Sequence, residues 1–200
     1  KLDRCAARWQ TAGARPTTGL PAKPLPRVAH PSATATDEAI IAAAIQLALP
    51  PLRRTALESP DSFQRHASRQ PCISCHQQSL PLSALSVARA RGFAVDEAVI
   101  GKTVERTEAF AGVLQEFDLQ TLFHPEPAIG NGYALWSLHL AGHPASAFTD
   151  SSVHQIAVIQ RADGSWPWNL PRPPIQASDI AATALAVRGL EDYPIPGRQK

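Results

Sequence analysis

The sequence predicts an all-α fold of paired helices that follows an extended N-terminal arm. Helical periodicity with matching start and stop residues recurs six times from about residue 36 onwards, strand-like alternation is absent, and a short pattern recurs every 50 residues. With 200 residues, 44% of them hydrophobic, the chain is long enough to bury one core. We therefore expect an arm over residues 1–35 and one α-hairpin repeat domain over residues 36–200.

The arm is predicted from its proline content. Five of the 19 prolines precede the first plausible helix, among Gly, Ala and Thr residues that offer few side chains to anchor a core. Proline fixes φ and lacks a backbone N–H donor, so the stretch is expected to be extended.

The first two predicted helices are bounded by a capping residue, by proline and by glycine. The first begins after Thr36 and is expected to end at Pro50 and Pro51, because proline removes a donor that a helix interior needs. The second covers residues 79–91 and is expected to end at Gly92.

Four further helices are predicted, and the same types of residue bound them. Asp96 opens the third, residues 130–140 and 149–160 form the fourth and fifth, and Ser178 caps the sixth, which ends before Pro194. The third carries an apolar stripe at helical spacing that consists of Val99, Ile100, Thr103, Val104, Thr107, Phe110 and Leu114.

An internal repeat links three of these helices. A period that holds two helices is typical of stacked α-hairpins, in which each repeat buries its face against the next. The matching positions, 50 residues apart, are Ala84-Leu85, Ala134-Leu135 and Ala184-Leu185. The ring-bearing residues Phe93, His143 and Tyr193 have the same spacing.

Gln160, Gly164 and Trp166 lie between the fifth and sixth helices. Their spacing resembles the Gln-Trp motif of the squalene-hopene cyclase and prenyltransferase α/α-toroid superfamily, over roughly residues 36–198. The resemblance implies a toroid or a segment of one, in which Gln and Trp tie a helix end to the next loop. The resemblance does not imply the catalytic activity of either enzyme class. Of the acidic cluster of the cyclases only Asp179 is present, and an acidic residue there suits a helix N-terminus. The zinc ligands of the transferases are missing. We therefore expect no enzyme activity.

The motif that carries chemistry is Cys72-Ile-Ser-Cys75-His76, the C-x-x-C-H signature of c-type haem attachment. Two thiols at this spacing can each form a thioether with one haem vinyl group, and the adjacent imidazole then becomes the proximal iron ligand. The segment that follows, residues 77–81, resembles a group of exported bacterial proteins in which C-x-x-C-H precedes toroid repeats. The sequence thus predicts one covalently attached haem c.

Two other uses of the motif remain open. A thioredoxin-like dithiol also has C-x-x-C, but on a βαβ scaffold that this sequence does not predict. A structural zinc site could use the two thiols and His76 with one further ligand, although zinc sites usually combine two separated ligand pairs.

The sixth iron ligand cannot be methionine, because the chain contains none. The distal ligand is therefore expected to be a histidine, a lysine, a weaker ligand, water, or a group from another chain. His124 is the first choice, since a shift of 50 residues brings the C-x-x-C-H segment onto the loop that contains it. His66 and His30 are the alternatives, whereas His143 is interpreted as a helix cap, and His139 and His154 as ordinary helix residues.

These observations predict a monohaem c-type cytochrome that transfers single electrons outside the cytoplasm, in the periplasm or extracellularly. Covalent haem is attached there, and a chain that starts at Lys1 without methionine is expected to have lost an upstream segment. A single haem needs a partner haem, so we expect contacts with other cytochromes or self-association into an oligomer or filament, with the arm and Cys5 as a candidate tether. The alternatives are a haem-based ligand sensor with an open distal site and a zinc-binding structural protein.

Two classes of partner are not expected. A net charge of +2 without a basic run gives no electrostatic footprint for nucleic acid. Apolar runs stay shorter than the roughly 18 residues that span a bilayer.

Overall fold

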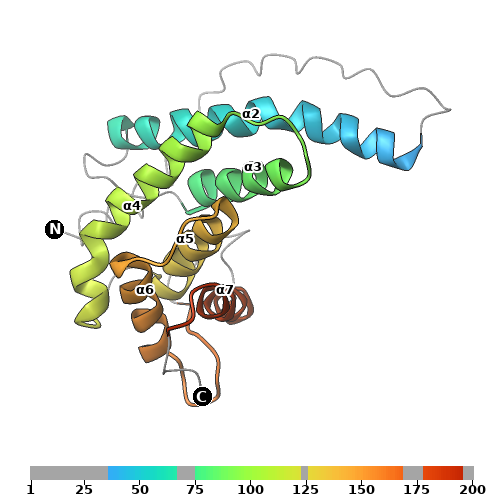
Figure 1. Ribbon diagram of the computed structural model, residues 1–200. Coiled ribbons are helices and arrows are strands. Elements are labelled where there is room, and N and C mark those ends of the chain that lie inside the picture. The colour runs from blue at the N-terminus through green and yellow to red at the C-terminus, as the bar shows by residue number, and fades with distance from the viewer. Residues whose placement is uncertain (1–35, 67–74, 123–125, 169–177, 196–200) are drawn as a thin grey trace, which may run out of the picture.

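The computed structural model describes residues 36–66, 75–122, 126–168 and 178–195, and the regular structure in these ranges is entirely helical, as predicted. Six α-helices and one short π-helical segment, η1, follow one another along the chain (Figure 1). Their bounds are α2 Asp37–His66, η1 Cys75–Ser79, α3 Leu80–Ala90, α4 Glu97–Leu119, α5 Pro127–Ala141, α6 Ala147–Val158 and α7 Asp179–Asp192.

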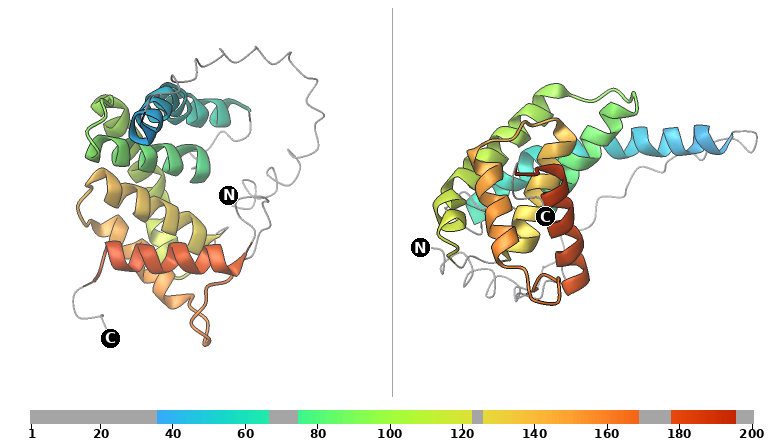
Figure 2. Two further views of the ribbon diagram at one scale, coloured as in Figure 1. Left: turned by 90° about the vertical axis from the view of Figure 1, so that its right-hand side faces the viewer. Right: turned by 60° about the horizontal axis from the view of Figure 1, so that its bottom comes forward.

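The helices form two rows that pack against each other. In one row α3, α5 and α7 are successive neighbours, and in the other α2, α4 and α6 are. The three helices that carry the 50-residue pattern therefore lie side by side in a single row (Figure 2). The first turns of α2 extend beyond the other helices (Figures 1 and 2).

Two hydrophobic clusters fill the space between the rows. The larger one lies among α5, α6 and α7 and includes Ile129, Leu135, Ile156 and Trp166. The smaller one joins α2, α3 and α4. Its buried members are Ala56, Leu82, Leu85, Val99 and Ile100.

The prediction that Pro50 and Pro51 end the first helix is wrong. Helix α2 continues through both residues to His66. An interior proline costs about 3 kcal/mol. The turns that follow are packed against the smaller cluster, and Ala56 among them is fully buried. Packing of this later part of α2 explains why the helix continues.

Several predicted helix boundaries are confirmed. The Thr36 hydroxyl accepts a hydrogen bond from the Ala39 N–H, and the Asp96 and Ser178 side chains cap α4 and α7. Gly92 follows α3 with φ of +82°, a backbone conformation that glycine adopts without strain. Gly142 ends α5 in the same way, with φ of +84°.

Two helices start earlier than predicted. Helix α5 begins at Pro127 rather than residue 130, because proline suits the first turn of a helix. Helix α6 begins after Ser146 rather than at Thr149. Ser146 and Thr149 form a reciprocal capping box in which each side chain accepts a backbone N–H of the other.

The predicted N-terminal arm, with Cys5 and His30, lies outside the described residues. Within the described ranges, the helices lack a stretch that is both long and apolar enough to cross a bilayer.

Candidate functional site

The C-x-x-C-H motif leads into the π-helical segment. Cys75 and His76 are the first two residues of η1, and only their backbone belongs to the described structure. Cys72 and His124, the other two residues predicted to hold a haem, lie outside the described residues. The site is therefore built from the residues that surround η1.

Two glutamines anchor η1 to two different helices. Gln77 Oε1 accepts a 2.6 Å hydrogen bond from the Ser59 hydroxyl of α2. Gln78 is buried, and its Nε2 lies 3.3 Å from Thr107 Oγ1 of α4. Because η1 also packs against α3 and α5, the chain immediately after His76 has a fixed place among four helices.

A cavity of about 460 Å³ opens between the C-terminal part of α2 and η1. Gln77 contributes from η1, and all the other lining residues come from α2. They are Arg54, Thr55, Glu58, Ser59, Ser62 and His66. The volume lies within the range of about 300–1,000 Å³ that is usual for small-molecule sites, and the described lining is polar throughout.

The imidazole of His66 has a defined tautomer in this cavity. Its Nδ1 lies 2.9 Å from the Ser62 carbonyl oxygen, one turn earlier in α2. A carbonyl oxygen can only accept, so Nδ1 carries the hydrogen, and Nε2 of the neutral ring keeps its lone pair. His66 is thus a nitrogen donor at the edge of the cavity that Gln77 also lines.

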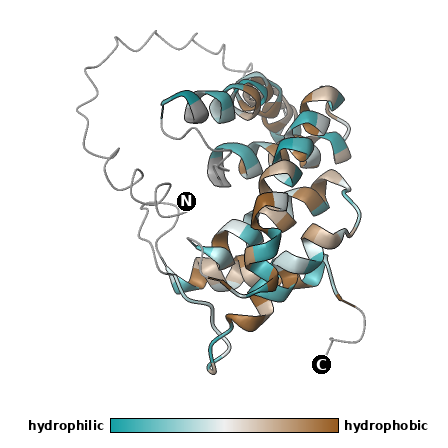
Figure 3. Ribbon diagram, turned by 90° about the vertical axis from the view of Figure 1, so that its left-hand side faces the viewer, coloured by the Kyte–Doolittle hydropathy of each residue, from teal (hydrophilic) through white to brown (hydrophobic). Residues whose placement is uncertain are grey.

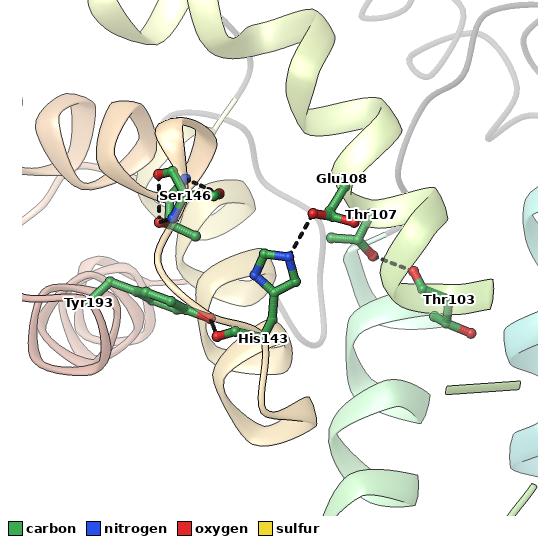
Figure 4. Close-up of polar contacts among 7 residues, drawn as sticks. Thr103, Thr107, Glu108, His143, Ser146 and Tyr193 are labelled. Carbon is green, nitrogen blue, oxygen red and sulfur yellow. Dashed lines mark hydrogen bonds and ion pairs between the residues drawn. The ribbon is translucent and has the colours of Figure 1, made fainter. Parts of the chain in front are cut away.

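His143 joins three helices away from this cavity. Its Nε2 lies 2.6 Å from Glu108 Oε1 of α4, and its backbone carbonyl accepts a 2.9 Å hydrogen bond from the Tyr193 hydroxyl (Figure 4). Burial, reinforced by Asp192, raises the pKa of the Tyr193 phenol. The backbone of His143 does cap α5, since its N–H donates to the Leu138 carbonyl. The ring, however, contacts Glu108 rather than the helix end.

A buried carboxylate connects α4, α5 and α6. Both oxygens of Asp118 lie 3.2 Å from Asn131 Nδ2, and the Ser152 hydroxyl donates to Oδ2 at 3.1 Å. All three side chains are buried. The sequence interpretation missed this cluster, although Asp118 lies four residues after Leu114 and continues the predicted stripe of α4.

The loop after α6 shows what Gln160 and Trp166 do. Gln160 Nε2 donates to the Gly164 carbonyl at 3.0 Å, within the loop itself. Trp166 is buried, and its Nε1 donates to the Ile156 carbonyl near the end of α6 at 2.7 Å. The tip of this loop is hydrophilic (Figure 3).

Asp179 occupies the first turn of α7, as the sequence predicts. Arg161 donates to its carboxylate at 2.6 Å, and the Trp168 N–H donates at 2.8 Å. Both interactions hold the pKa of the Asp179 carboxyl below its ordinary value, with the Arg161 hydrogen bond as the larger cause.

Several aromatic side chains belong to the larger hydrophobic cluster or pack against it. Tyr133 is buried in the larger cluster, and Trp136 and Trp168 pack against it, whereas Phe123 lies outside the described residues. His139 contacts Asp192 at 3.5 Å.

Comparison of the chain with protein-family models, curated proteins and solved structures finds no match.

Proposed function

We propose that this chain is a monohaem c-type cytochrome that transfers single electrons outside the cytoplasm. The observation that carries the proposal is the C-x-x-C-H motif, because Cys72 and Cys75 have the spacing for two thioethers and His76 the position of the proximal ligand. A bound haem c supplies one-electron redox chemistry. No catalytic residue is needed for that role, and we propose no enzyme activity.

The described residues of the cavity beside η1 could meet only the polar edge of such a group, because their side chains are all polar. The cavity beside Gln77 has room for part of a large ligand, and Arg54 on its wall offers a cation for a propionate. Gln77 and Gln78 hold the segment after His76 against α2 and α4 through their hydrogen bonds. We propose that these contacts orient the motif and leave one side of the site open, as electron exchange with a partner requires.

The scaffold is proposed to be a row of α-hairpin repeats, a segment of an α/α toroid. The order of α3, α5 and α7 in one row supports this, since their matching Ala-Leu pairs are 50 residues apart. Helices α3 and α5 also end alike. The N–H groups of Phe93 and His143, again 50 residues apart, donate to Ala88 and Leu138 after a glycine with positive φ.

An absorption spectrum of the full chain, produced with export and haem attachment, tests the proposal. We expect a sharp α-band in the reduced protein, and haem that stays bound to the denatured chain. Cys72→Ala and Cys75→Ala each remove one thioether, while Cys5→Ala serves as the matched control that leaves both. A protein without a visible band that binds zinc instead would overturn the proposal.

Carbon monoxide separates the electron carrier from a ligand sensor. An α-band that does not change on addition of carbon monoxide shows two protein ligands on the iron, as the electron carrier needs. A shifted band shows an open distal position and favours the sensor.

The proposed partners are other cytochromes or further copies of the chain. Cys5 in the proline-rich segment is the proposed tether, because the motif uses the other two cysteines. Gel mobility under non-reducing and reducing conditions tests it. A Cys5-dependent slower species is expected, and identical migration would remove the tether from the proposal.

A further inference from the structure

We propose that the N-terminal half of α2 pairs antiparallel with the same helix of a second copy of this chain. The exposed apolar surface of α2 and the charges at the two ends of that surface identify this partner. The inference goes beyond the proposed function, because the pairing involves only α2 and holds whether or not the chain carries haem.

The first turns of α2 extend beyond the other helices (Figures 1 and 2). Residues 39–49 carry only one polar side chain, yet residues 37–48 are all exposed or half-buried. Ile40, Ile41 and Leu47 expose 41%, 58% and 52% of their surface. A helix that is apolar on all sides is normally buried, and a helix of about 12 residues is only marginally stable alone in water. This part of α2 therefore needs a partner surface.

Exposed residues of α2 form one stripe with alternating spacings of three and four residues. This is the heptad pattern by which two helices pack side by side. We call the stripe the α2 seam, and it consists of Asp37, Ile40, Ala44, Leu47, Pro51 and Arg54. The helix packs into the smaller hydrophobic cluster through another face, with Leu49, Leu52 and Ala56. A second copy can therefore reach the α2 seam without displacing the core.

The charges at the ends of the α2 seam determine the orientation of the pair. The spacings of the seam are the same in both directions, so two antiparallel copies match along its whole length. Asp37 then lies beside the partner's Arg54, Ala44 lies beside the partner's Leu47, and a two-fold axis repeats each contact. A parallel pair would instead place Asp37 beside the partner's Asp37 and Arg54 beside the partner's Arg54, which brings like charges together.

Both charged residues of the α2 seam are available for such a contact. Asp37 and Arg54 are exposed, and neither has an ion-pair partner within the described part of the chain. The neighbouring Arg53, in contrast, pairs with Asp96 at 3.1 Å. A guanidinium has five N–H donors, so a bond to the partner's Asp37 leaves donors for the cavity that Arg54 also lines.

Sedimentation equilibrium of the full chain with Cys5→Ala tests the proposal, because a Cys5 disulfide then cannot hold two copies together. We expect a dimer. Leu47→Glu should raise its dissociation constant at least about a hundredfold, since two unpaired carboxylates would be buried at the centre of the α2 seam. Val113→Glu in α4 is the matched control, because Val113 is 55% exposed and lies outside the seam, and it should keep the dimer. Circular dichroism should show the same helix content in both variants.

A charge exchange tests the antiparallel orientation. Asp37→Arg and Arg54→Asp should each weaken the dimer about tenfold, because each places like charges together at two symmetry-related positions. The double variant restores opposite charges and should recover most of the lost affinity. Misfolding cannot produce this recovery, so the comparison stays valid if Leu47→Glu reduces the yield of folded protein.

Three outcomes would overturn the pairing. The first is a Cys5→Ala chain that stays monomeric at its highest soluble concentration, and binding of that monomer to phosphatidylcholine vesicles would identify a lipid surface as the occupant. The second is a dimer that Leu47→Glu leaves intact, because another surface would then hold the copies. The third is a double charge variant that does not recover affinity. The absorption spectrum of the haem is measured separately, so loss of the dimer does not affect the proposed function.

Discussion

Gly132 of α5 lies against Leu185 of α7 so closely that a Cβ at position 132 would be 2.8 Å from Leu185 Cβ and 3.0 Å from its carbonyl oxygen. Separations under 3.0 Å do not occur for real Cβ atoms, and part of the obstruction is backbone that cannot rotate away. The close approach of α5 and α7 therefore requires glycine at this position.

Gly132→Ala is expected to destabilise the protein by about 1–3 kcal/mol, as overpacking does in other cores. Gly130→Ala is the matched control in the same helix, because a Cβ there would meet nothing within 4 Å. Alanine is the better helix former by up to about 1 kcal/mol, so Gly130→Ala should stabilise. Urea unfolding of both variants measures the difference, and equal effects would contradict the close packing.

The buried carboxylate of Asp118 gives the second prediction. Asp118→Ala leaves Asn131 Nδ2 and the Ser152 hydroxyl without their acceptor inside the protein. An unsatisfied buried polar group costs about 1–3 kcal/mol, so a loss of about 2–6 kcal/mol is expected for the two together. Asp150→Ala, which removes an exposed carboxylate of α6, should cost far less.

A double-variant cycle tests whether the hydrogen bond between Ser152 and Asp118 stabilises the protein. Ser152→Ala alone should cost about 1 kcal/mol, and its effect should largely disappear when Asp118 is already alanine. Additive free energies of unfolding would show that the two side chains do not stabilise each other.

Helix order and most helix ends could be predicted from the sequence, because they depend on local chemistry. The caps at Thr36, Asp96 and Ser178 and the glycine at position 92 act through hydrogen bonds and φ angles within a few residues. The end of α2 could not be predicted in this way. Its continuation past Pro50 depends on packing with helices that come later in the chain.

The candidate site also has one part that local sequence predicts and another that depends on tertiary packing. The C-x-x-C-H motif is visible in the sequence because its spacing is short. The cavity is not, since it forms where Gln77 meets a face of α2 that lies 11–23 residues earlier. The partners of Asp118 were missed for a similar reason: Asn131 and Ser152 lie on two other helices, and their contacts need the tertiary packing.

Trp166 and Gln160 give the third prediction, about the loop after α6. Trp166→Phe keeps an aromatic ring but removes the buried hydrogen bond to the Ile156 carbonyl, so a loss of about 1–3 kcal/mol is expected. Gln160 is exposed and bonds only within the loop, and Gln160→Ala should change stability by less than about 0.5 kcal/mol. Thermal unfolding compares the two. A larger effect at Gln160 would show that the glutamine, not the tryptophan, holds the loop.

The ion pair between Asp179 and Arg161 gives the fourth prediction, a dependence of stability on pH. The Arg161 and Trp168 hydrogen bonds lower the pKa of Asp179 in the folded protein, whereas the unfolded chain has the ordinary value of about 3.9. The folded state is therefore stabilised fully when the pH lies above the unfolded value. This stabilisation is lost as the pH falls through the lowered pKa, because protonation then removes the charge in both states.

Asp179→Asn should accordingly be less stable than the wild type at pH 7, with a difference that shrinks as the pH approaches 3. Arg161→Gln should reproduce the same dependence, because it removes the main cause of the lowered pKa. Urea unfolding at pH 7, 5 and 3 measures the free energies, and the double variant shows whether the two effects are shared. A difference that stays constant over this range would mean that the Asp179→Asn variant loses packing or hydrogen bonds of the side chain rather than the charge interaction with Arg161.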